Sequence, residues 1–526
     1  MADKQAQVLE SQLEYLSLSK PRRILYKFTH FFTSIPKNLK RAFSSTPGKA
    51  RKLSSSFFGV FRNLFSAFRY GDWKTILSAL LMGFGLVTRR QILRGVFYFL
   101  FEAAFIFFMI IIGAPSLGNL GNLGYIASSK HTELNDIITI SVPKYYDNSF
   151  TILLYSIITI FLILLFVVLW YNQLVDSKRL QDSENIGKYA SDRTSVKNIF
   201  DKSYATTLLA IPIGGLFVFT ILPMVMMIAI AFTDYNYLHE PTDKLFDWVG
   251  FYNFGTVFSI TSSSGGNSIL LQVFGRVLLW TLVWAFFATF SNYFIGMVVA
   301  MIINIKGIKL KKLWRTVLIT TIAIPQFISL LLISQMFSDE GIVNSFLQML
   351  HITSKNIRFL SDPIIAKITI ILVNTWVGIP YTMLICTGLL MNIPEDLYES
   401  ARIDGASPFT MYFKITLPYM LFVTGPYLIN QFVGNINNFN VIYLLSQGGP
   451  SFTAAFVGQV VPALVRDSNV GQTDLLITWI YKITTNSSYD YGMASVLGLM
   501  IFVIIAFFSL IFYSNSSANK DEEAFQ

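Results

Sequence analysis

Uncharged polar side chains recur at helical spacing within two long apolar stretches of the sequence. Each set is spaced i, i+4 and i+7: Asn374, Gly378 and Tyr381 in one, and Gln431, Asn435 and Asn438 in the other. Residues at these intervals share one face of a helix. Amides and phenols donate and accept hydrogen bonds, which suits the hydroxyl groups of a neutral polyol and offers an anion no counter-charge. The alternative is that these amides only join neighbouring helices.

A polar strip, residues 392–409, separates the two stretches and reads NIPEDLYESARIDGASPF. Pro394 suits the first position of a helix, Gly405 can take the positive φ at which that helix stops, and Ser407 can cap a second helix. The strip is therefore predicted to form a short, bent pair of helices. From these residues alone it is either a docking surface or an ordinary interfacial link between two spans.

The composition places these residues in a membrane. Of the 526 residues, 53% are hydrophobic and 13% charged, and the mean hydropathy is +0.54. The formal charge of +10 would form a patch in a nucleic-acid-binding protein, but in a membrane protein it is sorted by topology. We therefore expect membrane lipid and no nucleic acid among the partners.

Spanning segments follow from length, because crossing about 30 Å of hydrocarbon takes roughly 20 apolar helical residues. Eight stretches meet this requirement: 93–114, 150–171, 206–232, 277–303, 313–337, 364–391, 417–445 and 492–513. Residues 76–87 are too short and are expected to lie in the interface or to re-enter. The predicted fold class is an all-α integral membrane protein with about eight transmembrane helices.

Orientation follows from the distribution of basic residues, which are retained in the cytoplasm. With the N-terminus inside, the cytoplasmic segments carry 31 Lys and Arg residues and the opposite loops carry 7. Both termini and the polar strip are therefore predicted to be cytoplasmic. The polar first residues lack the apolar core of a signal peptide, so none is expected.

The first 92 residues form a basic arm that is rich in aromatic residues. Phe57, Phe61, Phe65 and Phe68 recur at helical spacing, with Arg62 on the other side. This pattern is typical of a helix that lies on an anionic membrane surface. Docking onto a soluble partner is the alternative.

Several kinds of chemistry find no support in the residues. The single cysteine, Cys386, and four scattered histidines have no metal-ligand spacing. There is no G-x-x-x-x-G-K-[ST] motif, so ATP hydrolysis must come from partners, and we expect no cofactor and no enzyme activity in this chain. An ion-coupled transporter would place carboxylates in its spans, where only Glu102 stands. Glu102 itself is expected to pair with another subunit or to snorkel to an edge. A membrane-bound transferase would need paired carboxylates or a metal site.

The segment ESARIDGASPFTMYFKITLP, residues 399–418, resembles the EAA loop of binding-protein-dependent ABC importer permeases, whose pattern is E-A-A-x-x-D-G-A, an aromatic residue and I-x-L-P. The matching residues are Glu399, Ala401, Asp404, Gly405, Ala406, Phe413, Ile415, Leu417 and Pro418. Ser400 replaces the first alanine. The resemblance implies that Glu399, Ala401, Asp404, Gly405 and Ala406 form a coupling helix that inserts into a cleft on an ATPase subunit.

Further segments resemble the maltose and maltodextrin permeases of the MalF type. They are FTILPMVMMIAIAFTDYN, NTWVGIPYTMLICTGLL, NNFNVIYLLSQGGP and TDLLITWIYK, so the resemblance covers about residues 205–513. It implies a role in sugar binding for Asn374, Gly378, Tyr381, Asn435 and Asn438. The expected function is that of a permease subunit for maltose- or maltodextrin-type oligosaccharides that works by alternating access. Another neutral solute is the alternative.

The resemblance also implies partners and a division of the chain. The expected partners are a second, MalG-like permease subunit, two ATP-binding subunits that hold ATP and Mg, and an extracellular solute-binding protein, at the plasma membrane of a bacterium. The expected segments are an arm (1–92), two accessory spans with a cytoplasmic loop (93–204), an ABC type I importer permease core (205–514) with the coupling helix at 392–416, and a cytoplasmic tail (515–526).

Overall fold

A computed structural model describes most of the chain beyond the N-terminal arm. The described residues are 59–127, 130–134, 138–142, 145–187, 189, 192, 204–239, 244–258, 269–305, 307–452 and 462–515. Phe57 and most of the arm and tail lie outside them. Within the described residues the chain is helical apart from four short strands. These pair antiparallel in the loop 115–149: β1 (Ile126–Ala127) with β4 (Tyr145–Tyr146), and β2 (Lys130–Leu134) with β3 (Ile138–Val142).

Six helical segments in the described part of the chain are long and apolar enough to span a membrane: Ile92–Gly118, Ser149–Asn185, Leu208–Ile230, Ile269–Asn304, Pro363–Leu390 and Tyr491–Leu510. They coincide with six of the eight predicted spans. The predicted span 313–337 is a bent pair, Lys311–Ala323 and Gln326–Met336, whose halves meet at 89° around Pro325. The predicted span 417–445 is broken at Asn437 and Asn438, so it stays a prediction that it crosses the membrane.

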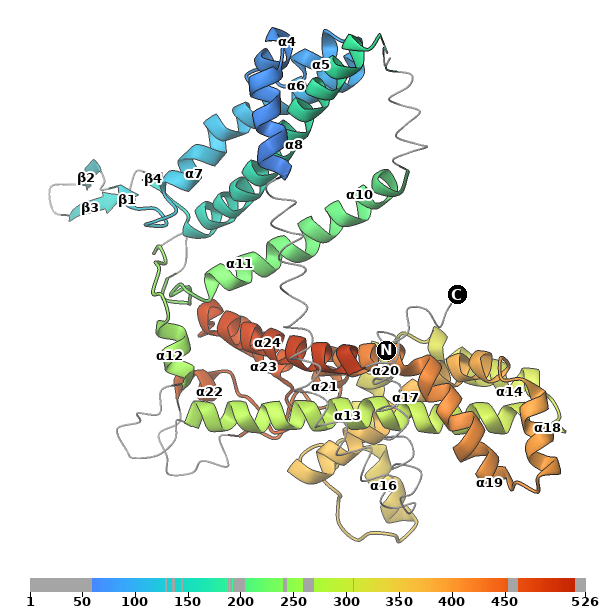
Figure 1. Cartoon of the computed structure of the whole chain (residues 1–526). Coiled ribbons are helices and arrows are strands. Elements are labelled where there is room, and N and C mark those ends of the chain that lie inside the picture. The colour runs from blue at the N-terminus through green and yellow to red at the C-terminus, as the bar shows by residue number, and fades with distance from the viewer. Residues whose placement is uncertain are drawn as a thin grey trace, which may run out of the picture.

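The described helices follow one another along the chain, and Figure 1 labels most of them. They are α4 (Trp73–Leu77), α5 (Phe84–Val87), α6 (Ile92–Phe108), α7 (Ala114–Gly118), α8 (Ser149–Asn185), α10 (Tyr204–Leu216), α11 (Leu222–Ile230), α12 (Tyr252–Phe258), α13 (Ile269–Asn304), α14 (Lys311–Thr320), α15 (Gln326–Met336), α16 (Ile342–Met349), α17 (Pro363–Leu390), α18 (Glu395–Ile403), α19 (Pro408–Met411), α20 (Leu417–Ile436), α21 (Phe439–Leu445), α22 (Ala463–Asp467), α23 (Leu476–Thr485) and α24 (Tyr491–Asn515).

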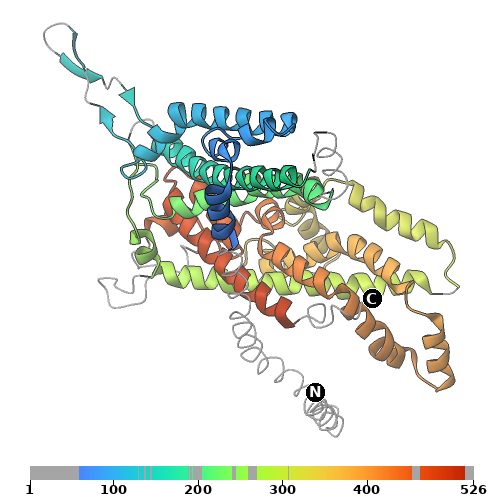
Figure 2. The same cartoon turned by 45° about the horizontal axis from the view of Figure 1, so that its top comes forward.

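Helix α13 is the central element of the C-terminal half, where it packs along α17 and against α20. Small buried residues, among them Ala288, Gly296 and Ala300, line this contact and let the neighbouring backbones approach. Figures 1 and 2 show α12 and α22 at one end of α13, and α14, α18 and α19 at the other. The loops predicted to be extracellular and those predicted to be cytoplasmic thus lie at opposite ends of α13. Which of the two ends faces the cytoplasm stays a prediction.

Three π-helical turns in the described helices each precede a proline by two residues. The turns are Met109–Gly113, Phe217–Ile221 and Tyr412–Thr416, and the prolines are Pro115, Pro223 and Pro418. Proline lacks an N–H, and its ring clashes with the carbonyl four residues earlier. That carbonyl lies inside the wider turn, which explains how these helices continue past proline. Such turns are frequent at functional sites.

The predicted surface helix of the arm is present in its described part. Residues 59–70 are helical, and Phe61, Phe65 and Phe68 are each about half exposed. Asn63 donates a hydrogen bond to the hydroxyl of Tyr171 over 3.3 Å, which fixes the helix to α8. The exposed aromatic row agrees with the predicted amphipathic pattern, and its contact with lipid stays a prediction.

Glu102 forms a hydrogen bond within the chain, whereas the sequence predicted that it pairs with another subunit or snorkels to an edge. Residues 76–87 contain the end of α4 and all of α5, two short helices that pack on α6 and α8, and their place in the interface stays a prediction. The buried Glu102 accepts a hydrogen bond from the Met82 backbone N–H over 2.8 Å. Beside it, Gln173 of α8 accepts from the Ser78 hydroxyl over 2.6 Å and donates to the Ser78 carbonyl over 2.7 Å. Glu102 is therefore a structural acceptor for a buried turn.

We expect Glu102→Ala to lower the free energy of unfolding by about 1–3 kcal/mol, because the buried Met82 N–H would lose its acceptor. Glu102→Gln keeps an acceptor oxygen and should cost clearly less. Thermal unfolding of the detergent-solubilised protein, followed by circular dichroism, measures both changes. Equal melting temperatures for Glu102→Ala and the wild type would contradict this role.

Candidate solute site and coupling helix

A small polar cavity lies between α13, α17 and α20, at about the middle of their contact. Its volume is about 70 Å³, and its lining residues are Ala288, Thr289, Asn292, Tyr293, Gly378, Tyr381, Thr382, Tyr427 and Gln431. Three of the six predicted solute residues, Gly378, Tyr381 and Gln431, thus meet in one place. Ligand pockets usually measure about 300–1,000 Å³. The three helices must therefore separate before a sugar ring can enter.

Two amide side chains, one lining the cavity and one on α17 a turn before Gly378, each have one polar atom without a hydrogen-bond partner in the described part of the chain. The buried Nδ2 of Asn374 and the buried Oδ1 of Asn292 have none among the described residues. Gly378 lies directly against the Asn292 side chain, which a Cβ at this position would overlap. An unsatisfied buried polar group costs about 1–3 kcal/mol, and such a group calls for a specific explanation. Hydroxyl groups of a bound polyol would supply the missing donor and acceptor.

Asn435 and Asn438 serve the protein itself in this conformation. Asn435 donates from Nδ2 to the Thr289 hydroxyl over 2.9 Å, and its backbone carbonyl accepts from the Trp284 indole N–H over 3.0 Å. Asn438 caps α21 by accepting from the Val441 N–H over 3.3 Å. Neither residue lines the cavity: Asn435 joins α20 to α13, and Asn438 caps a helix. Their role in solute binding stays a prediction.

Sequence reasoning missed the contribution of α13. Thr289 and Asn292 line the cavity, and Gly296 lies on the same helical face, at i, i+3 and i+7 within an apolar stretch. This is the same kind of signal that identified the sets on α17 and α20. Tyr427 of α20 was also missed. Its position four residues before Gln431 extends that set by one turn and could have identified it.

The polar strip forms the predicted bent pair of helices. Gly405 follows α18 with a φ of 75°, and the Ala406 N–H donates to the Ala401 carbonyl over 2.9 Å. Ser407 caps α19 by accepting from the Thr410 N–H over 3.2 Å. This local hydrogen bonding fixes the corner. The Tyr398 hydroxyl lies 2.8 Å from that of Thr416, which connects α18 to the turn before α20.

The surface of the pair is exposed in a way that suits docking. None of the residues of α18 or α19 is buried, and both helices lie near the α14 end of α13. The predicted coupling residues Glu399, Asp404 and Gly405 are exposed, and Ala401 and Ala406 are half-buried. Ile403 is 87% and Phe409 78% exposed, which is unusual for apolar side chains at a water-facing corner. The described residues hold no cluster of three or more His, Cys, Asp or Glu side chains that could bind a metal.

Comparisons with known proteins assign the chain to a family. The family described as "Binding-protein-dependent transport system inner membrane component" matches residues 292–518. "Maltodextrin transport system permease protein MalC" of Streptococcus pneumoniae serotype 4 is 31% identical over 464 residues, which cover 86% of this chain and 97% of that protein. The chain belongs to this permease family. As the resemblance implied, it is a transport subunit of the ABC importer type and not an enzyme.

Other relatives show how far the similarity extends. "Galactooligosaccharides transport system permease protein GanP" of Bacillus subtilis is 30% identical over 449 residues, covering 85% of the permease and 98% of that protein. "Maltose/maltodextrin transport system permease protein MalF" of Escherichia coli K12 is 35% identical over 265 residues, but these cover 50% of the permease and 48% of that protein. Similarity to MalC and GanP therefore reaches well before residue 205, where the resemblance of the quoted sequence segments begins.

Solved structures also include a similar chain. A chain of a bacterial alginate ABC transporter, in complex with alginate pentasaccharide-bound periplasmic protein, matches with a TM-score of 0.43 and 21% identity. The match covers 62% of the permease and 98% of that chain.

Proposed function

We propose that the permease is one of two membrane subunits of a bacterial importer for maltose- or maltodextrin-type oligosaccharides. The observation that carries this proposal is the uncharged cavity between α13, α17 and α20, whose amides and phenols suit sugar hydroxyl groups. Relatives named for maltodextrin transport support the sugar class. Another neutral oligosaccharide is the second candidate, because GanP, named for galactooligosaccharides, is similar to almost the same extent.

The proposed mechanism is alternating access driven through α18. The chain leaves α17, forms α18 and α19, and continues through the turn Tyr412–Thr416 into α20. The coupling helix thus joins the two helices that carry most of the predicted solute residues. Closure of ATPase subunits around α18 would move the ends of α17 and α20 jointly, as one unit. The contact of Tyr398 with Thr416 would transmit that movement from α18 to α20. Separation of these helices from α13 would open the cavity.

The proposal includes partners that hold what this chain lacks. They are a second, MalG-like permease subunit, two ATP-binding subunits with ATP and Mg, and an extracellular solute-binding protein. We further propose a plasma-membrane location with both termini in the cytoplasm. The proposed segments are the arm (1–92), the accessory spans (93–204), the transport core (205–514) with its coupling helix at 392–416, and the tail (515–526).

Sugar-stimulated ATP hydrolysis by the complex in lipid tests the function. With the solute-binding protein present, maltodextrins should stimulate the wild type more than galactooligosaccharides or polyols do. Asn292→Ala should reduce this stimulation about tenfold, because one sugar hydrogen bond together with its alignment contributes about 1.4 kcal/mol. Asn435→Ala combined with Asn438→Ala tests the predicted residues of α20.

Asn430→Ala is the matched control, since Asn430 is an exposed neighbour of Gln431 on α20. It should leave the stimulation within about twofold of the wild type. Stimulation by another solute alone would overturn the sugar class but keep the importer. Full stimulation of Asn292→Ala would remove the cavity from the solute pathway.

A further inference from the structure

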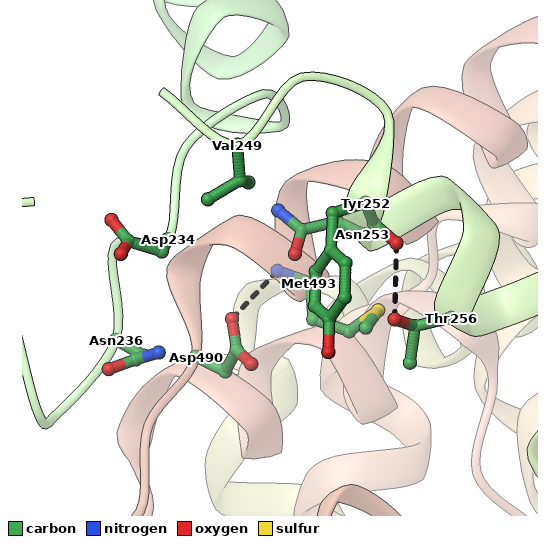
Figure 3. Close-up of a pocket in the computed structure, with 8 residues that line it drawn as sticks. All are labelled: Asp234, Asn236, Val249, Tyr252, Asn253, Thr256, Asp490 and Met493. Carbon is green, nitrogen blue, oxygen red and sulfur yellow. Dashed lines mark hydrogen bonds between the residues drawn. The ribbon is translucent and has the colours of Figure 1, made fainter. Parts of the chain in front are cut away.

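A second and larger pocket lies at the end of the molecule where α12 is found, away from the coupling helix. Its volume is about 480 Å³. The lining residues come from the segment after α11, from α12 and the residues before it, and from the start of α24 (Figure 3): Asp234, Asn236, Val249, Tyr252, Asn253, Thr256, Asp490 and Met493. We call it the acidic pocket. Its position matches the face predicted to be extracellular.

The polar side chains of the acidic pocket are fixed by the backbone. Asp490 caps α24 by accepting from the Met493 N–H over 2.8 Å, and Asp234 accepts from the Asp247 N–H over 2.7 Å. Asn253, with only 8% of its surface exposed, donates from Nδ2 to the carbonyls of Ala231 and Thr233. Asn253 lines the pocket, and the hydrogen bonds of its side chain to the described residues use Nδ2 alone. Acceptor oxygens of three side chains therefore line one pocket.

The charge of the acidic pocket is poorly compensated. Burial, and next the charge of Asp234, raise the pKa of Asp490 above its usual value. Within the described residues no Lys or Arg forms an ion pair with either carboxylate, and His239 Nε2 lies 3.6 Å from Asp234. The neighbouring segments 240–243 and 259–268, outside the described residues, contain no Lys or Arg in the sequence. A cationic ligand would compensate this negative charge further.

The side chains that line the acidic pocket favour an organic cation over a bare metal ion. Two carboxylates and one amide oxygen provide acceptors for the several N–H donors of an ammonium or guanidinium group. Tyr252 lines the same pocket and is 72% exposed, so its ring is open to contact with a cation. Among the described residues no three His, Cys, Asp or Glu side chains have metal-binding geometry.

We propose that the acidic pocket receives a Lys or Arg side chain of the extracellular solute-binding protein and so anchors that protein on the permease. The inference rests on the proposed function, which supplies this partner. A neutral sugar would leave both carboxylates uncompensated, whereas a basic side chain provides the opposite charge as well as the donors. The pocket volume accommodates the charged group together with its aliphatic stem.

The test uses the assembled complex in lipid nanodiscs and the solute-binding protein that assembles with it. Asp234→Asn combined with Asp490→Asn removes both charges, while asparagine keeps the acceptor that caps α24. We expect the dissociation constant of the binding protein to rise at least tenfold and its salt dependence to decrease. Asp362→Asn is the matched control, because Asp362 caps α17 in the same way, by accepting from Ile364 and Ile365. It should leave binding within twofold.

A photo-crosslinking residue in place of Tyr252 identifies the occupant independently. Crosslinks should map next to a Lys or Arg on the binding protein. Crosslinks to a surface without basic residues would overturn the inference, as would an unchanged dissociation constant in the double variant. Unchanged binding combined with lost sugar stimulation would instead assign the pocket to the solute. If no binding protein associates even with the wild type, the proposed function itself fails.

Discussion

Gly405→Pro is expected to abolish sugar-stimulated ATP hydrolysis while the permease still inserts into the membrane. Gly405 has a φ of 75°, and its N–H donates to the Arg402 carbonyl over 3.0 Å. Proline fixes φ near −65° and lacks this N–H, so the corner between α18 and α19 cannot form. Proline also disfavours the helical conformation of the preceding residue, Asp404. The docking surface would therefore lose its shape.

Graded substitutions separate the shape of the corner from the mere presence of a side chain. No atom lies within 4 Å of a Cβ at position 405, so steric overlap is not the issue there. Asparagine adopts positive φ readily and should retain most of the stimulation, whereas alanine costs about 1 kcal/mol and should fall between. The readout is the ATPase rate of the purified complex together with the amount of co-purified ATPase subunit. Normal stimulation of Gly405→Pro would refute the assignment of a coupling helix.

Asp474→Ala should destabilise the loop between α21 and α23 by about 3–5 kcal/mol, because it leaves a basic group without its partner. Asp474 is fully buried, and Lys482 donates to it over 2.7 Å with only 15% of its own side chain exposed. The carboxylate also accepts from the Gly471 N–H and the Thr478 hydroxyl, over 2.7 and 2.8 Å. Gly448 lies so close that a Cβ there would overlap the carboxylate. One side chain thus connects three segments.

The expected result is a large fall in the melting temperature and in the yield of assembled complex. Asp467→Ala is the matched control, since Asp467 forms an ion pair with the exposed Arg466 over 2.8 Å in the same loop. Exposed pairs contribute about 0–1 kcal/mol, so this control should unfold almost as the wild type does. Similar melting temperatures for the two variants would show that Asp474 is not the connecting group.

Much of the candidate site was predictable from sequence, but not all of it. The corner at Gly405 and the cap at Ser407 were predicted correctly, because both depend on backbone preferences of a few consecutive residues. The two polar sets were found because helical spacing places their members on one face. Their use was not predictable: Gln431 lines the cavity, whereas Asn438 caps α21.

The sequence by itself determined the membrane class, six of the spans and the coupling corner, since apolar length and turn chemistry are local properties. Tertiary structure alone decided which helix supplies the opposite wall of the cavity. Asn292 of α13 faces Gly378 of α17 because α13 packs along α17, a contact between residues far apart in the chain. The same holds for the hydrogen bond of Glu102 with Met82 and for the contact of Asp474 with Gly448, which are set by packing. A hydrogen bond between distant segments depends on which surfaces meet, and that choice is made by the packing of the whole chain.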